Sequence, residues 1–140
     1  LLPRQALNKR CFTGLIETVG ADRIGFDDFR CNGLLLPARE DAALRLALPL
    51  HRGPHRRYNE MVIQRMGRIE RRWSLQKQSR PDEAAAVALM RLALLQRALR
   101  RRLLDVRKPL RLNRKDRQAA RVDFTDLDAM AGLLWEASAD

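Results

Sequence analysis

Residues 50–73 read LHRGPHRRYNEMVIQRMGRIERRW and contain both histidines of the chain, followed by a long amphipathic pattern. In the second half of this stretch, apolar residues return every three or four positions, which is the period of one helix face. Pro54 stands just before the pattern and suits the first turn of a helix. We therefore predict a helix that begins near Pro54, with His51 and His55 at its entrance. Its apolar face consists of Tyr58, Val62, Met66, Ile69 and Trp73.

Three further helices are predicted from periodicity and capping signals. One covers residues 7–19 and ends at Gly20, and a second runs from a serine cap at Ser79 to about Asp105. The arginines at 100–102 suit the negative end of this second helix, although a phosphate contact is the alternative. Residues 106–122 are basic and aperiodic, which predicts a loop. A last helix is expected over residues 125–137, with an inner face of Leu127, Met130, Leu134 and Trp135.

Two short apolar runs are the candidates for β-structure. Leu34–Leu36 is stopped by Pro37, and a second run covers residues 46–50. Each is too short for a helix, so we predict a small hairpin. Asn32-Gly33 before the first run suits a turn with positive φ. Residues 21–32 show no helical period and are predicted to be loop. The fold class expected is α+β, predominantly helical.

Charge is the most unusual property of the composition. The 140 residues include 28 lysines and arginines, 24 of them arginine, against 17 acidic residues, for a net charge of +11. Arginine pairs bidentately with phosphate, and a polyanion is the natural partner of such a surface. Ordinary solvated surface charge explains the same composition, and both readings stay open. No segment has the about 18 uncharged apolar residues of a membrane helix, so an integral membrane protein is excluded.

The two cysteines, Cys11 and Cys31, do not form a Cys-x-x-Cys pair. They predict neither a disulfide framework nor a zinc site, and we expect two buried thiols. The first residue, Leu1, is not a methionine, so we expect the natural start to lie upstream. The lack of a leader sequence therefore carries no information.

The residues best suited to chemistry are the two histidines, which are four positions apart. Two imidazoles at one helix entrance can supply half of a tetrahedral metal shell. In the alternative reading, one histidine caps the helix and the other packs against it. The neighbouring Arg52, Arg56 and Arg57 could grip phosphates, or they could be plain surface charge.

Three blocks of the sequence together resemble the AHH family of nucleases, which belongs to the HNH/endonuclease VII group. That family's pattern is a histidine dyad followed by two apolar residues and proline, then Asn-Gly before an apolar run ending in Leu-Pro, then His-x-Gly-x-His-x-x-Tyr-Asn. In this chain the counterparts are Leu1-Leu2-Pro3, residues 32–37 and residues 51–59. The resemblance covers about half the chain, from Leu1 to Ile69. The dyad itself would stand directly before Leu1 and is missing from this sequence.

The resemblance implies a ββα-metal finger, made of the short hairpin and the following helix, packed against additional helices. It implies a single domain over residues 1–140, with the finger in residues 1–75 and a helical extension in residues 76–140. His51 and His55 would be the metal ligands, or one would be a ligand and the other a neighbour that contacts phosphate. Asn32 would orient the catalytic base through the strand that holds it. In the alternative reading Asn32 is a plain turn residue. Tyr58 and Asn59 would contact the metal ligands without binding the metal themselves, although simple packing is favoured for Tyr58.

The function implied is a metal-dependent endonuclease of the HNH type that hydrolyses phosphodiester bonds in DNA, or in RNA. The cofactor expected is one divalent ion, which could be Mg, Zn, Mn or Ni. By resemblance alone, the protein would be a bacterial toxin or effector, acting in the cytoplasm or secreted, with an inhibitor or immunity protein as a further partner. The alternative is a non-catalytic basic module that binds nucleic acid, motivated by the missing dyad. A third reading is a helical interaction protein that exposes Leu89, Leu92 and Leu99.

Overall fold

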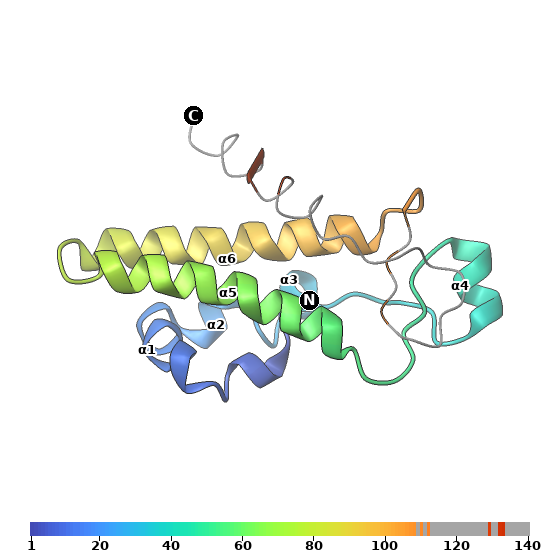
Figure 1. Ribbon diagram of the computed structural model, residues 1–140, viewed down its shortest axis with the longest axis horizontal. Coiled ribbons are helices and arrows are strands. Elements are labelled where there is room, and N and C mark those ends of the chain that lie inside the picture. Colours follow the sequence, from blue (N-terminus) through green and yellow to red (C-terminus); the bar gives the residue numbers. More distant parts are fainter. Residues whose placement is uncertain (109, 111, 113–128, 130–131, 134–140) are drawn as a thin grey trace.

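A computed structural model describes residues 1–108 together with 110, 112, 129, 132 and 133. Two long helices, α5 (Arg56–Gln76) and α6 (Pro81–Leu103), lie antiparallel and side by side (Figure 1). Both helices were predicted from the period of their apolar residues, and they are confirmed. The serine cap is wrong, because Arg80 is the N-cap of α6 and Pro81 opens the helix.

Helix α1 (Arg10–Val19) packs across α5 and α6 near the middle of the pair. Its period of three and four predicted it, and Phe12, Leu15 and Val19 are buried as expected. Gly20 ends the helix with a positive φ of 90°. The start is later than predicted, because residues 4–6 form a separate 3-10 turn, η1 (Arg4–Ala6), before the extended backbone of Lys9.

The segment predicted as a loop over residues 21–32 contains two helices of a single turn each, α2 (Ala21–Ile24) and α3 (Phe29–Asn32). Four residues are too few for an apolar period, so the pattern could not reveal them. Gly25 joins them in the left-handed region at φ 74°, and the Asp28 carboxylate accepts a hydrogen bond from the backbone nitrogen of Arg30 at the start of α3. Both short helices contact α6.

The predicted hairpin is wrong, since no strand occurs among the residues that the structure describes. Residues 34–36 are irregular, and Leu46 ends a short helix, α4 (Glu40–Leu46). One backbone hydrogen bond, from the His51 nitrogen to the Pro37 oxygen at 2.8 Å, still joins the two segments. Pro37 and Pro49 lack an N–H, so the segments cannot build a regular ladder. The described part is therefore helical rather than α+β, and the ββα finger is not seen.

A single apolar cluster joins η1, α1, α2, α5 and α6. It contains residues on both sides of residue 75, where the boundary of the metal finger was expected. Leu92 and Leu99 are buried in this cluster and Leu89 packs on it, so the basis for a helical interaction protein is lost. Cys11 and Cys31 are free and exposed, which corrects the prediction of buried thiols.

Most of the expected loop at 106–122 and of the expected helix at 125–137 lies outside the described residues, including the inner face of that helix. Residues 129, 132 and 133 are helical. Within the described part of the chain, no helix combines the length and the apolar character needed to cross a bilayer.

Candidate functional site

The two histidines lie beside each other at the start of α5. His51 is exposed on the segment that leads into the helix, and His55 is half-buried at the N-cap. Between them the chain bends at Gly53, which has a φ of 80°, a conformation that glycine adopts without strain. The centroids of the two imidazole rings are 4.7 Å apart, with an angle of 37° between the ring planes. The structure thus brings together the pair that the spacing singled out.

The electrostatic surroundings of His55 favour the neutral imidazole. Burial and the neighbouring His51 lower the pKa of His55 below its usual range, and a hydrogen bond with the backbone of Leu112 acts in the opposite direction. Its Nδ1 atom is buried and has no hydrogen-bond partner. A neutral ring with an unused lone pair is the form that binds a metal ion. The donor chemistry of His51 and His55 therefore fits a divalent transition metal.

A complete metal shell is not formed by the described residues. No group of three or more histidine, cysteine, aspartate or glutamate side chains converges in the part of the chain that the structure describes. The pair His51 and His55 supplies two ligands, and further ligands would have to come from elsewhere, from water or from a phosphate oxygen.

Asn32 forms the most extensive polar contacts near this site. Its side chain is buried, and its Oδ1 atom accepts from the backbone nitrogen of Leu2 at 2.6 Å. Its Nδ2 atom donates to the backbone oxygens of Leu2 at 3.0 Å and of Phe26 at 3.1 Å. The backbone is not in the predicted turn, because Gly33 is extended, with φ −89° and ψ 157°. Asn32 therefore acts as a clamp on the backbone of Leu2.

Tyr58 connects the same end of the chain to α5. Its Oη atom donates a hydrogen bond to the Leu1 oxygen at 2.9 Å, while the ring lies in the apolar core. The Leu1 nitrogen donates to the Asn32 oxygen at 2.6 Å. Tyr58 thus packs, as favoured, and also makes a polar contact. Tyr58 lies in the first turn of α5, which begins directly after His55, so its hydroxyl joins the Leu1 oxygen to the start of this helix.

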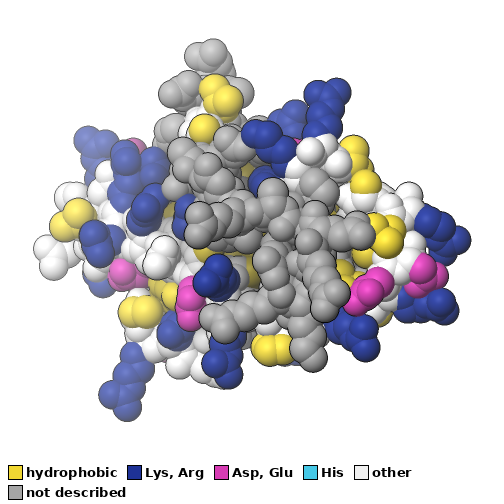
Figure 2. All heavy atoms as spheres, turned by 45° about the vertical axis from the view of Figure 1, so that its right-hand side comes forward, with side chains coloured by type: hydrophobic (Ala, Val, Ile, Leu, Met, Phe, Trp, Pro, Cys, Tyr) yellow, Lys and Arg dark blue, Asp and Glu magenta, His cyan; other side chains and the backbone are white. Residues whose placement is uncertain are grey.

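The remaining predicted residues take no part in this network. Asn59 is half-buried, and its backbone nitrogen donates to the His55 oxygen at 2.9 Å. Arg52, Arg56 and Arg57 are exposed, and within the described residues none of them forms an ion pair. Figure 2 shows arginine and lysine side chains spread over the visible face, with fewer acidic ones between them.

Two residues of α6 join the site and were missed from the sequence. Gln96 is buried, and its Nε2 atom lies 3.1 Å from the Ile24 oxygen and 3.5 Å from Asn32 Oδ1. Arg100 donates to backbone oxygens of α3. One signal was available for Gln96, because it stands at helical spacing between Leu92 and Leu99, so a polar residue interrupts an apolar face.

Comparison with known proteins gives one result. The family model of AHH, described as a nuclease family of the HNH/ENDO VII superfamily with conserved AHH, matches residues 2–101. This range includes the clamp at Asn32, the histidine pair and nearly all of α6, and it extends beyond the stretch whose motifs indicated the resemblance. No curated protein and no solved structure matches the chain. Since the matched range covers well over half of its residues, the chain belongs to the AHH nuclease family of the HNH/ENDO VII superfamily.

Proposed function

We propose that this protein is a metal-dependent endonuclease that hydrolyses phosphodiester bonds in DNA, in preference to RNA. The observation that carries the proposal is the attachment of Leu1 and Leu2 to Asn32 and to Tyr58, which lies in the first turn of α5, directly after the histidine pair. Asn32 holds the backbone of Leu2, and the Tyr58 hydroxyl donates to the Leu1 oxygen. The family pattern places its histidine dyad directly before this point. A dyad joined to Leu1 would therefore approach His51 and His55.

Each group has a defined task in such a site. His51 and His55 would hold a divalent ion, which neutralises charge on the scissile phosphate and stabilises the departing oxygen when bound. The attacking water would lose its proton to an imidazole of the dyad, whose ordinary pKa suits a general base at neutral pH. Asn32 would fix that imidazole through the backbone of Leu2. The exposed Arg52, Arg56 and Arg57 would bind neighbouring phosphates.

The test is plasmid nicking by a protein in which Ala-His-His is joined to Leu1, assayed with Mg²⁺, Mn²⁺, Zn²⁺ and Ni²⁺. We expect nicking with at least one of these ions, and loss of at least about a hundredfold when His51→Ala and His55→Ala are combined. The matched control combines Gln76→Ala, at the last residue of α5, with Gln78→Ala, in the turn that follows, and both positions are exposed. Full activity of the double histidine variant would refute the proposal. An RNA substrate in parallel tests the preference for DNA.

Metal binding can be measured without any reaction. In the protein that begins at Leu1, without the added Ala-His-His, Zn²⁺ should shift the imidazole resonances of both histidines together in an NMR titration. The His51→Ala variant should weaken the response of His55 by about tenfold or more, because one of the two ligands is lost. Independent responses of the two rings would contradict a shared ion.

The non-catalytic alternative corresponds to a different outcome of the nicking experiment. A protein that carries the dyad, binds duplex DNA and leaves it intact with every ion would be a nucleic-acid-binding module. A role as a bacterial toxin or effector, opposed by an immunity protein, is a further proposal. Its test is growth arrest on expression with the dyad in place, and no arrest with the double histidine variant.

A further inference from the structure

The single turn of α3 places Asn32, and this turn depends on partners from outside itself. The last four carbonyl groups of any helix have no partner within it, and in a four-residue helix these are all the carbonyl groups. The Phe29 oxygen accepts from the Gly33 nitrogen at 2.7 Å, and the Asn32 oxygen accepts from the Leu1 nitrogen at 2.6 Å. The other two carbonyl oxygens belong to Arg30 and Cys31.

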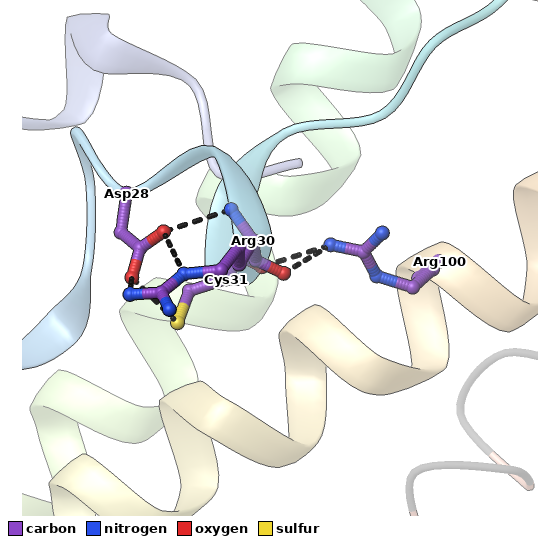
Figure 3. Close-up of polar contacts among 4 residues, drawn as sticks. All are labelled: Asp28, Arg30, Cys31 and Arg100. Carbon is purple, nitrogen blue, oxygen red and sulfur yellow. Dashed lines mark hydrogen bonds and ion pairs between the residues drawn. The ribbon is translucent and has the colours of Figure 1, made fainter.

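Arg100 supplies the partner for both of these oxygens. Its Nη2 atom lies 2.7 Å from the Arg30 oxygen and 3.5 Å from the Cys31 oxygen. Figure 3 shows the guanidinium reaching from α6 to the end of α3, while the Arg30 side chain turns the other way, to Asp28. Hydrogen bonds from a charged donor are stronger than neutral ones, so Arg100 supports this turn from α6, in addition to the contact from the Leu1 nitrogen.

Gln96 supports the same segment one turn earlier on α6. Its Nε2 atom donates to the Ile24 oxygen at 3.1 Å and approaches Asn32 Oδ1 at 3.5 Å. Asn32 Oδ1 is also the acceptor for the Leu2 nitrogen. The side chains at positions four apart lie on one face of a helix, so α6 presents Gln96 and Arg100 to the segment that carries Asn32.

We propose that Gln96 and Arg100 are positioning residues of the nuclease site. They fix Asn32, and Asn32 fixes the backbone of Leu2, which follows the Leu1 to which the family's dyad would be joined. This inference rests on the proposed function. It assigns to α6 a part in catalysis, in addition to its place in the core. A loss of position costs rate rather than substrate affinity, because neither residue is placed at the phosphate.

Four variants of the protein with Ala-His-His joined to Leu1 test this role. Arg100→Met removes the donor, Arg100→Lys keeps a cationic donor, and Gln96→Met removes the amide at similar volume. Arg97→Met is the control, because Arg97 is exposed on the same turn and its loss changes the net charge equally. The readouts are kcat and KM of nicking, hydrogen exchange of the Leu2 amide, and the urea midpoint as a measure of global stability.

We expect Arg100→Met and Gln96→Met to lower kcat by about tenfold with KM unchanged, and to speed exchange of the Leu2 amide by a similar factor. Arg100→Lys should recover most of the rate, and Arg97→Met should match the parent. If Arg100→Met behaves as Arg97→Met, or if exchange speeds up while kcat stays constant, the positioning role is refuted. If the parent nicks no DNA with any ion, the proposed function fails and the positioning role fails with it.

Discussion

At the scale of single residues, burial and partners decide what a side chain does. Asn32 and Asn59 are the same residue type and both belong to the family pattern. Asn32 is buried and uses both ends of its amide on backbone groups of Leu2 and Phe26. A buried amide without partners would cost about 1–3 kcal/mol, so its satisfied bonds keep the site ordered. Asn59 is half-buried, and the contact described above is the hydrogen bond from its backbone nitrogen to the His55 oxygen.

Tyr58 gives a prediction about pH. Burial raises the pKa of the Tyr58 phenol well above its usual range. Above about pH 10 the unfolded chain releases the phenolic proton while the folded protein retains it, so stability falls as the pH rises further. Tyr58 is the single tyrosine, so absorbance at 295 nm follows it alone. Ionisation should coincide with unfolding seen by circular dichroism, and it should occur near pH 10 in 6 M guanidinium. Ionisation near pH 10 in the folded protein would contradict a buried phenol.

At the scale of elements, the long helices and the short ones are stable for different reasons. Helices α5 and α6 bury continuous apolar faces against each other and against α1. Helices α2 and α3 are single turns, and isolated turns are unstable in water. They depend on the Asp28 cap, on the left-handed Gly25 and on donors from α6.

A pair of glycine variants separates these two kinds of element. A Cβ atom at Gly25 would lie 2.9 Å from Cys31 Cβ, and the φ of 74° is strained for alanine, so Gly25→Ala should cost about 1–3 kcal/mol. At Gly67, in the middle of α5, an added Cβ meets nothing within 4 Å. Gly67→Ala should therefore stabilise the protein by about 0.5–1 kcal/mol through its higher helix propensity. Urea denaturation measures both changes, and equal effects of the two variants would contradict this account.

At the scale of the whole molecule, a strong positive charge accompanies one continuous apolar core in the described residues. The net charge of +11 is carried mainly by arginines on exposed helix faces, while the apolar cluster joins both halves of the chain. A field of this sign attracts polyanions from a distance, and contacts near the histidine pair would then hold the phosphate backbone in place.

Salt dependence tests where the nucleic acid lies. The logarithm of the association constant for duplex DNA should fall linearly with the logarithm of salt concentration, with a slope of about −0.9 for each phosphate contacted. Combining Arg52→Gln, Arg56→Gln and Arg57→Gln should make that slope shallower by about 2 to 3. The control combines Arg10→Gln, Arg23→Gln and Arg45→Gln, which are exposed positions away from the histidines. Equal changes in both triple variants would show that binding is spread over the surface.

The sequence alone determined the long helices and the closeness of the two histidines, because both depend on spacing within about 20 residues. Periodicity located α1, α5 and α6, and the spacing of His51 and His55 placed both rings at one helix entrance. The family pattern also indicated Asn32 as a residue that orients the catalytic base, and the structure shows that its side chain binds the backbone of Leu2. The hairpin failed because Pro37 ends the first apolar run after three residues, Pro49 interrupts the second, and Leu46 belongs to α4.

Only the tertiary structure decided how α6 contributes to the site. Gln96 and Arg100 lie 64 to 72 residues along the chain from the groups that they contact. A helical period shows which face of a helix is buried. It does not show with which distant carbonyl group a polar side chain on or beside that face will form a hydrogen bond. The single turns of α2 and α3 were not predicted for a related reason, since these long-range bonds stabilise them together with the local Asp28 cap and Gly25.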